Sequence, residues 1–153
     1  MPVYVKLPFI PPSSNNAYFQ RGKIRVLTSK GKKFKAEVKT YIAQHCQHFM
    51  AYFKKDTPYT LIACFNIGRD ELLNKTWPEQ AKERYKKYDA SNRLKLLEDA
   101  ICAACSHDDR QHMIVVAAKG MKATEDEPNT EVWVFNQEQE SCPVDEWIGQ
   151  QPR

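Results

Sequence analysis

The clearest buried strand of the chain is the stretch Pro58-Tyr-Thr-Leu-Ile-Ala-Cys-Phe-Asn-Ile67. A short, nearly continuous apolar run between turn-forming residues is typical of such a strand. Residues 68–88, which follow it, are polar and charged and predict an inserted loop with one helical turn or more. From residue 89 to about residue 105 the apolar residues recur at helical spacing. They predict a helix whose core-facing side chains are Leu94, Leu97, Ile101 and Ala104.

The elements before this strand follow from the same periodicities. Residues 3–7 alternate apolar and polar side chains and predict a strand. Residues 17–27 contain a central Arg-Gly pair and predict a short hairpin. Either Thr28 or Ser29 can then cap a long helix over residues 30–53, whose apolar side chains fall on one stripe of a 3.6-residue period.

The elements after the second helix complete the fold prediction. Residues 106–110 predict a turn, and residues 112–122 and 130–136 predict two more strands. This order of elements indicates a single α+β domain with a mixed β-sheet and two main helices. We expect the domain to cover residues 1–137 and residues 138–153 to form a loose acidic tail.

The size and composition of the chain fit one soluble globular domain. It has 153 residues, of which 42% are hydrophobic and 27% are charged. No apolar run approaches the ~20 residues that a membrane span needs. The first ten residues are too short and too rich in proline for a secretory signal. We therefore expect a cytoplasmic protein with no membrane partner.

Charge is distributed unevenly along the chain. Residues 1–124 hold 22 of the 23 Lys and Arg but only 11 of the 19 Asp and Glu, a net charge of +11. Residues 125–153 carry a net charge of −7, so a basic body is joined to an acidic end. Simple solubility explains such charges equally well, but clustered Lys and Arg favour a polyanionic partner, because each one releases counterions from a phosphate. The two clusters are Lys30, Lys32, Lys33 and Lys35, and Lys82, Arg84, Lys86 and Lys87.

Five cysteines and two histidines raise the question of a zinc site. An odd number of cysteines in a chain without an export signal indicates reduced thiols. Cys102, Cys105, His107 and His112 resemble a zinc-binding set, but their spacing matches no common zinc finger. Structural cysteines inside the second helix are the preferred interpretation, and a zinc-dependent module stays a third alternative.

Few acidic residues interrupt the basic body, so their positions are informative. Asp89 opens the second helix, and Asp108 and Asp109 follow its end. Carboxylates brought together among Lys and Arg would form an oxygen site suited to Mg²⁺. The plain alternative is that Asp89 caps the helix and that the other two lie in a solvated turn. Lys95 and Asp99 are spaced four residues apart, which is compatible with an ordinary surface ion pair or with a phosphate-facing lysine.

Three motifs resemble the RusA-type Holliday-junction resolvases. Residues 7–18, Leu-Pro-Phe-Ile-Pro-Pro-Ser-Ser-Asn-Asn-Ala-Tyr, are similar to that family's "LPWPPSNNRYY" opening. Residues 89–101, Asp-Ala-Ser-Asn-Arg-Leu-Lys-Leu-Leu-Glu-Asp-Ala-Ile, resemble its "DLDNLQKAAFDAL" motif, and residues 108–111 resemble its "DDAQV" turn. The resemblance implies a RusA-like fold and a homodimeric endonuclease that cuts four-way DNA junctions with Mg²⁺.

The resemblance also assigns roles to individual residues. It implies that Asp89 and Asp109 are catalytic metal ligands, with Asp108 adjacent, and that Lys95 is the active-site lysine. One position departs from the family pattern, because Ser91 stands where the family has a second aspartate. A serine hydroxyl is a poor replacement for a carboxylate on Mg²⁺. Another acid, Asp99, Glu98 or Asp108, or a water would then complete the coordination of the metal.

The leading hypothesis is a Mg²⁺-dependent endonuclease that nicks branched DNA during recombination or repair, in a bacterial or phage-derived, nucleoid-associated setting. The alternative is a junction-binding protein of the same fold in which catalysis is weakened or lost at Ser91. In both cases the expected DNA contacts are Asn15, Asn16, Lys30, Lys32, Lys33, Lys86, Lys87 and Lys119.

Overall fold

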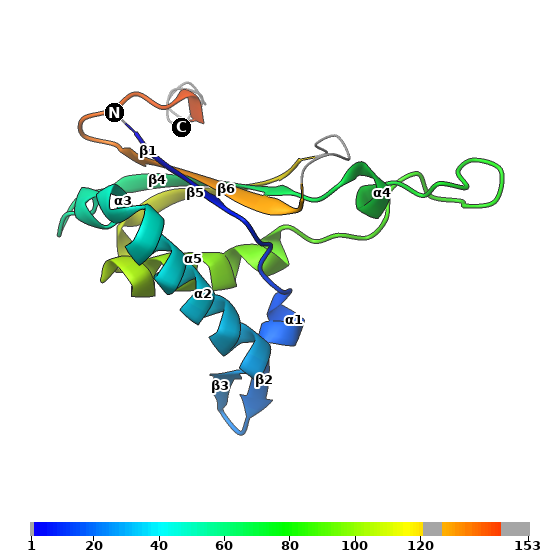
Figure 1. The fold of residues 1–153 in the computed structure, drawn as a ribbon, viewed down its shortest axis with the longest axis horizontal. Helices are drawn as coiled ribbons and strands as arrows, with labels where there is room; N and C mark the ends of the chain where they lie inside the picture. Colours follow the sequence, from blue (N-terminus) through cyan, green and yellow to red (C-terminus); the bar gives the residue numbers. More distant parts are fainter. Residues whose placement is uncertain (1, 121–126, 145–153) are drawn as a thin grey trace, which may run out of the picture.

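The computed structural model describes residues 2–120 and 127–144 and contains a mixed four-stranded sheet, a small hairpin and two long helices (Figure 1). The strands of the main sheet lie in the order β1–β6–β4–β5, with β4 and β5 parallel and the other pairs antiparallel. Its strands are β1 (Val3–Leu7), β4 (Tyr59–Asn66), β5 (His112–Gly120) and β6 (Asn129–Asn136). The predicted α+β class is confirmed.

The helices and the hairpin complete the fold. The two long helices, α2 and α5, lie on the same face of the main sheet (Figure 1). Strands β2 and β3 form the hairpin that projects beside the start of α2. The bounds are α1 (Ser14–Ala17), β2 (Tyr18–Arg21), β3 (Ile24–Leu27), α2 (Ser29–His45), α3 (Gln47–Tyr52), α4 (Arg69–Leu72), α5 (Ser91–Cys105) and the 3₁₀ turn η1 (Asp109–Gln111).

The core lies between the sheet and the two long helices. Alternate side chains of β4, Leu61, Ala63 and Phe65, are fully buried beneath the helices. Leu97 and Ile101 of α5 are equally buried against them. This alternation is the period-2 pattern of a strand, so the buried face of β4 follows directly from the sequence.

Helix α5 connects two parallel strands and therefore runs back along the sheet. Its first turn lies at the end of the sheet where β4 and β5 terminate. Lys119, the penultimate residue of β5, donates a hydrogen bond across 3.1 Å to the carbonyl of Tyr88, just before α5. The fold thus brings the last residues of β5 to the start of α5, where the sequence predicts chemistry.

Residues 69–88 form a long extension between β4 and α5, which we call the arm (Figure 1). It begins with the single turn of α4 and then runs out from the body and back. The predicted inserted loop with a helical turn is confirmed. The arm rejoins the body directly before Asp89.

Two helical predictions need correction. The helix predicted over residues 30–53 is two helices, because Cys46 leaves the helical conformation with φ −137° and ψ 47°. Thr28, not Ser29, is the cap, and its side chain accepts a hydrogen bond from the Gly31 N–H. In α5 the predicted residue Leu94 does pack against the core and is partly buried, but the prediction omitted Leu96 and Ala100, which are fully buried. Because α5 packs against α2 as well as the sheet, it buries a wider arc than a single stripe.

The chain after β6 remains in contact with the body at first. Cys142 is fully buried, and the Tyr52 hydroxyl donates a hydrogen bond to Glu140. Residues 121–122 of the strand predicted over 112–122 and residues 145–153 of the predicted tail lie outside the described residues. Among the described residues, no helix is both long enough and apolar enough to cross a membrane.

Candidate functional site

The first functional group is Asp89, which precedes α5 and stabilises its N-terminus. Its Oδ1 accepts hydrogen bonds from the Ser91 hydroxyl at 2.6 Å, from the Ser91 N–H at 3.0 Å and from the Asn92 N–H at 3.3 Å. These bonds, the Ser91 hydroxyl first, and the nearby Lys119 ammonium hold the pKa of Asp89 below its usual value. Asp89 is therefore an exposed, ionised carboxylate fixed at the positive end of a helix.

The second group is a cluster around Lys95, one turn further along α5. The Lys95 Nζ lies 2.9 Å from Asp99 Oδ1 and 3.4 Å from Asp109 Oδ2. The i,i+4 ion pair that spacing predicts is confirmed, and Asp109 joins it from η1. Hydrogen bonding to Asp99 is the largest cause of the raised pKa of Lys95. Two carboxylates thus converge on one cationic group.

The hairpin supplies two residues to this cluster that the sequence does not identify. The Tyr18 hydroxyl donates a hydrogen bond across 2.5 Å to Asp99 Oδ2, and the Arg25 guanidinium lies 4.6 Å from the centre of the Tyr18 ring. Burial and the contact with Asp99 raise the pKa of Tyr18, so the phenol stays protonated. Tyr18 is the last residue of the first family-like motif, and its place in that motif could have marked it as a candidate. Arg25 lies in none of the three motifs, so the sequence offered no sign of its role.

Asp108 points its carboxylate at a different partner. Its Oδ2 lies 2.7 Å from Arg110 Nη2 and 2.9 Å from Arg110 Nε, and its Oδ1 accepts from the Arg110 N–H. Hydrogen bonding to Arg110 lowers the pKa of Asp108 to about 2. Asp108 therefore orients Arg110 and caps η1 next to the cluster.

The structure divides the predicted site residues into two groups along one helix. Ser91, Lys95 and Asp99 are spaced by four residues and share a face of α5. Asp89 lies with Ser91 and Lys119 at the start of this face, and Asp109 lies with Lys95 and Asp99 further along it. No three His, Cys, Asp or Glu side chains in residues 2–120 and 127–144 form a ready metal-binding group. The donor chemistry nevertheless fits a hard cation, because two carboxylates already surround an ammonium.

A comparison with protein-family models matches residues 8–134 to endodeoxyribonuclease RusA. The match covers most of the chain and includes Asp89, Lys95, Asp99 and Asp109. The chain belongs to the RusA endodeoxyribonuclease family. The activity of this family is the resolution of Holliday junctions. A search of curated proteins found no significant match.

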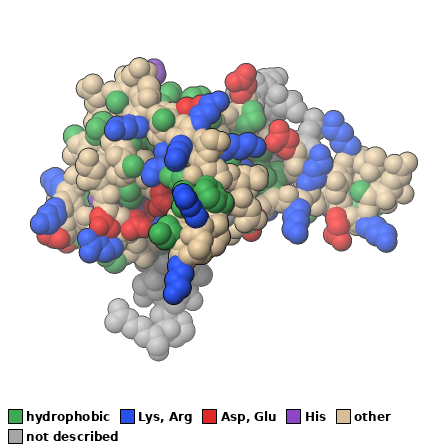
Figure 2. Space-filling view, turned by 90° about the horizontal axis from the view of Figure 1, so that it is seen from below, with side chains coloured by type: hydrophobic (Ala, Val, Ile, Leu, Met, Phe, Trp, Pro, Cys, Tyr) green, Lys and Arg blue, Asp and Glu red, His purple; other side chains and the backbone are tan. Residues whose placement is uncertain are grey.

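The residues predicted to contact DNA in this RusA-family protein are all at the surface. The three lysines of the α2 start, the two at the end of the arm and Lys119 are exposed, as are the two asparagines of α1. Figure 2 shows Lys and Arg side chains over the helical face and along the arm, with acidic side chains among them. They are accessible to a phosphate backbone and stay candidates for DNA contacts.

The residues of the zinc alternative are engaged with one another. Burial raises the pKa of both Cys102 and Cys105 to about 12, so these thiols stay protonated. The Nε2 atoms of His107 and His112 lie 3.0 Å apart, and His112 Nδ1 lies 2.9 Å from Glu98. Within residues 2–120 and 127–144 these side chains form no group of three or more that could hold a metal ion, so the arrangement does not favour a zinc module. Glu98 is directed to His112 and not to the Lys95 cluster.

Proposed function

We propose that this protein nicks Holliday junctions by Mg²⁺-assisted hydrolysis at the face of α5 that carries Asp89, Lys95, Asp99 and Asp109. Membership of the RusA family supports the substrate. The observation that carries the assignment of the site is the convergence of Asp99 and Asp109 on the Lys95 ammonium. Asp99, Asp109 and the Lys95 ammonium form an acidic cluster on a body whose net charge is otherwise positive.

Asp99 and Asp109, which meet at the Lys95 ammonium, are the carboxylates proposed to bind a metal together, and Asp89, which lies near Lys119 at the start of this face, is a separate proposed ligand. Asp99 lies two turns of α5 beyond Ser91 and supplies a carboxylate beside Asp109, not at the position where the family has its second aspartate. Asp108 stays outside the set because Arg110 holds its carboxylate. A bound Mg²⁺ would lower the pKa of a water and stabilise the leaving oxygen of the phosphodiester.

Lys95 has two tasks in this proposal. Without DNA, its ammonium neutralises Asp99 and Asp109. If a cation were bound by Asp99 and Asp109, the Lys95 ammonium would be free to face the scissile phosphate, where it would stabilise the charge of the transition state. Tyr18 holds the second oxygen of Asp99, which keeps that carboxylate in place during the exchange.

A homodimer fits this substrate. A four-way junction has two-fold symmetry, and its resolution requires two matching cuts. Two-fold pairing of identical subunits supplies both sites at once. In this proposal the basic surface of each subunit follows the DNA backbone, and the protein acts in the cytoplasm, where its substrate is found.

The test is cleavage of a synthetic four-way junction, with a linear duplex of the same sequence as the control substrate. We expect nicking of the junction only when Mg²⁺ is present. Asp109→Asn should abolish nicking and leave junction binding unchanged or tighter, because a carboxylate that holds a metal also repels phosphate. Both binding and nicking are read from the same labelled junction.

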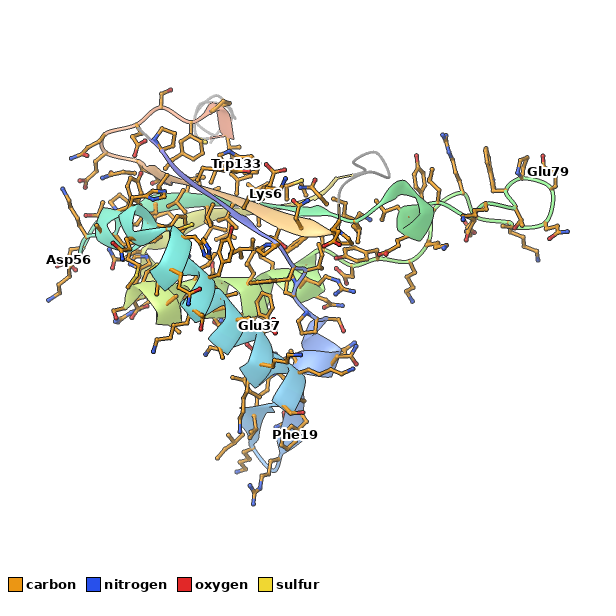
Figure 3. All side chains as sticks on the ribbon, viewed as in Figure 1. Lys6, Phe19, Glu37, Asp56, Glu79 and Trp133 are labelled. Atoms are coloured by element: carbon orange, nitrogen blue, oxygen red, sulfur yellow. The ribbon has the colours of Figure 1, made fainter. Side chains whose placement is uncertain are left out.

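Asp56→Asn is the matched control for this variant. Asp56 is exposed at the end of the molecule opposite the arm (Figure 3), and asparagine tolerates its φ of 56°. It should cut as the wild type does. Normal nicking by Asp109→Asn would remove Asp109 from the site.

The serine at position 91, where the family pattern has an aspartate, favours the second candidate, a junction-binding protein without nuclease activity. It predicts tight junction binding with no nicking at any Mg²⁺ or Mn²⁺ concentration. The same assay therefore separates the two functions.

A further inference from the structure

The arm keeps a defined shape without a hydrophobic core of its own. Its two limbs are joined by a β-bridge between Leu73 and Tyr85, and the Asn74 N–H donates to the Arg84 carbonyl at 2.9 Å. The Asn74 side chain also donates to the Glu83 carbonyl at 2.6 Å. Backbone pairing therefore holds the two limbs together. Figure 3 marks Glu79 toward the outer end of the arm, far from the sheet.

Two aromatic rings and one guanidinium form the main side-chain feature of the arm. The Arg84 Cζ lies 5.3 Å from the centre of the Trp77 ring and 5.5 Å from that of Tyr85. Trp77 is nevertheless 41% exposed and Tyr85 57% exposed. Large aromatic rings at the surface are costly to hydrate, and an arginine that pairs with both keeps their orientation fixed.

The charge and the position of the arm indicate which kind of partner binds the exposed rings of Trp77 and Tyr85. Lys82 and Lys87 are exposed on the same limb as Arg84. The arm enters α5 through Tyr88, whose carbonyl accepts from Lys119 next to Asp89. DNA held at Asp89 therefore lies at the root of the arm. A second protein copy is a poorer occupant, because a stable interface buries roughly 800 Å² per partner, far more than two rings offer.

We propose that Trp77, Arg84 and Tyr85 form a stacking platform for unpaired bases of branched DNA, with Lys82 and Lys87 on the adjacent phosphates. Stacking on aromatic rings is independent of sequence, since every base presents a π-face. Base pairs at a branch point lack a continuous stack and open more readily than those of intact duplex, so a platform that binds the opened bases gives preference for branched over linear DNA. This inference rests on the proposed function only in naming branched DNA as the partner.

The test uses Trp77 as a fluorescent reporter. The chain has three tryptophans, so the double variant Trp133→Phe, Trp147→Phe leaves Trp77 as the only one. We expect its emission to be quenched by oligothymidylate and by a four-way junction, and hardly at all by linear duplex. Wild-type protein titrated into a junction with 2-aminopurine at the branch point gives an independent measurement that needs no tryptophan replacement.

Trp77→Ala should weaken binding of oligothymidylate and junction by about 10-fold, which is the size expected for one lost stacking contact. Trp77→Phe should restore most of the affinity, because phenylalanine keeps a ring. Trp133→Phe is the control, since Trp133 packs against Tyr4 on the sheet.

The outcomes separate this proposal from the proposed function. Normal junction binding by Trp77→Ala, with nicking intact, would overturn the platform and leave the nuclease function standing. Trp77 emission that changes with protein concentration in the absence of DNA would show that a second copy covers the rings, and it would also overturn the platform. Quenching by oligothymidylate in a protein that never nicks a junction would support the platform and contradict the nuclease.

Discussion

At the scale of single residues, Ser91 decides how the active site is assembled. Its hydroxyl donates to Asp89 Oδ1 at 2.6 Å, so it fixes the orientation of that carboxylate but adds no charge. Asp99, two turns along the same helix, lies beside Asp109 through Lys95. Ser91 thus orients Asp89, and Asp99 places a carboxylate beside Asp109, whereas the family pattern has an aspartate at position 91.

The first prediction compares Asp99 with Asp108. Asp99→Asn should abolish Mg²⁺-dependent nicking, because it removes a carboxylate that converges with Asp109. Asp108→Asn should leave most of the activity, because that carboxylate serves Arg110. The measurement is the nicking rate of each variant on the same junction, which shows which of the two aspartates catalysis needs. The reverse result would place Asp108 on the metal and Asp99 in a structural ion pair.

The second prediction moves the carboxylate back to the family's position. Ser91→Asp in the Asp99→Asn background should restore part of the nicking, since an anion is tolerated at a helix N-terminus two residues from Asp89. Ser91→Asp alone should not lower the Mg²⁺ concentration that gives half-maximal nicking, because Asp99 and Asp109 already supply the carboxylates of the proposed metal site. Mg²⁺ titrations of both variants provide the measurement. A lower Mg²⁺ requirement in the single variant would mean that the ligand position is open in the wild type.

At the scale of elements, the hairpin is attached to the body through the first turn of α2. The Thr28 hydroxyl donates to the Asn16 carbonyl at 2.6 Å, and the Thr28 N–H donates to the Ala17 carbonyl at 2.8 Å. Gly31 lies against the same place, where a Cβ would meet the Ala17 carbonyl oxygen at 2.6 Å and a Leu27 methyl at 2.7 Å. This close approach sets where Tyr18 meets Asp99.

The third prediction follows from that contact. Gly31→Ala should destabilise the protein by about 1–3 kcal/mol, because the hairpin must move away to admit the methyl group. Nicking should fall as well, since Tyr18 leaves Asp99. Gly68→Ala is the control, because nothing lies within 4 Å of its added Cβ. Urea unfolding measures both variants, and equal stability of Gly31→Ala and the wild type would contradict the close packing.

At the scale of the whole molecule, charge governs the encounter with DNA. The body carries the net charge of +11, and the lysines at the start of α2 are exposed. Each lysine that neutralises a phosphate of duplex DNA contributes about 0.9 to the slope of log affinity against log salt. The slope of log affinity against log salt therefore measures how many lysines contact DNA phosphates.

The fourth prediction uses this slope. Junction affinity should fall steeply with salt, and the triple variant Lys30→Gln, Lys32→Gln, Lys33→Gln should flatten the slope by about 2.7. The double variant Lys54→Gln, Lys55→Gln is the control, since these exposed lysines lie in the connection between α3 and β4, at the opposite end of the molecule from the arm. Binding titrations at several salt concentrations give the slopes. Affinity that hardly changes with salt would argue against a DNA partner.

The sequence by itself determined the elements and their class. The alternation in β1 and β4 and the apolar spacing in α5 are local periodicities, so they can be read without a structure. The motif around Asp89 and the i,i+4 pair of Lys95 and Asp99 are local as well, and the pair is confirmed. The family resemblance followed from the same motifs and is confirmed by the match over residues 8–134.

Only the tertiary structure decided which of these residues meet. Tyr18 reaches Asp99 across 81 positions of sequence, and Asp109 reaches Lys95 across 14. The returning strand β5 brings Lys119, not Asp109, to the start of α5. In the turn before β5, the carboxylate of Asp108 pairs with Arg110. Such contacts depend on how α2, α5 and the sheet pack together. A periodicity within one segment carries no information about them, because it specifies which face is buried and not which distant side chain lies opposite.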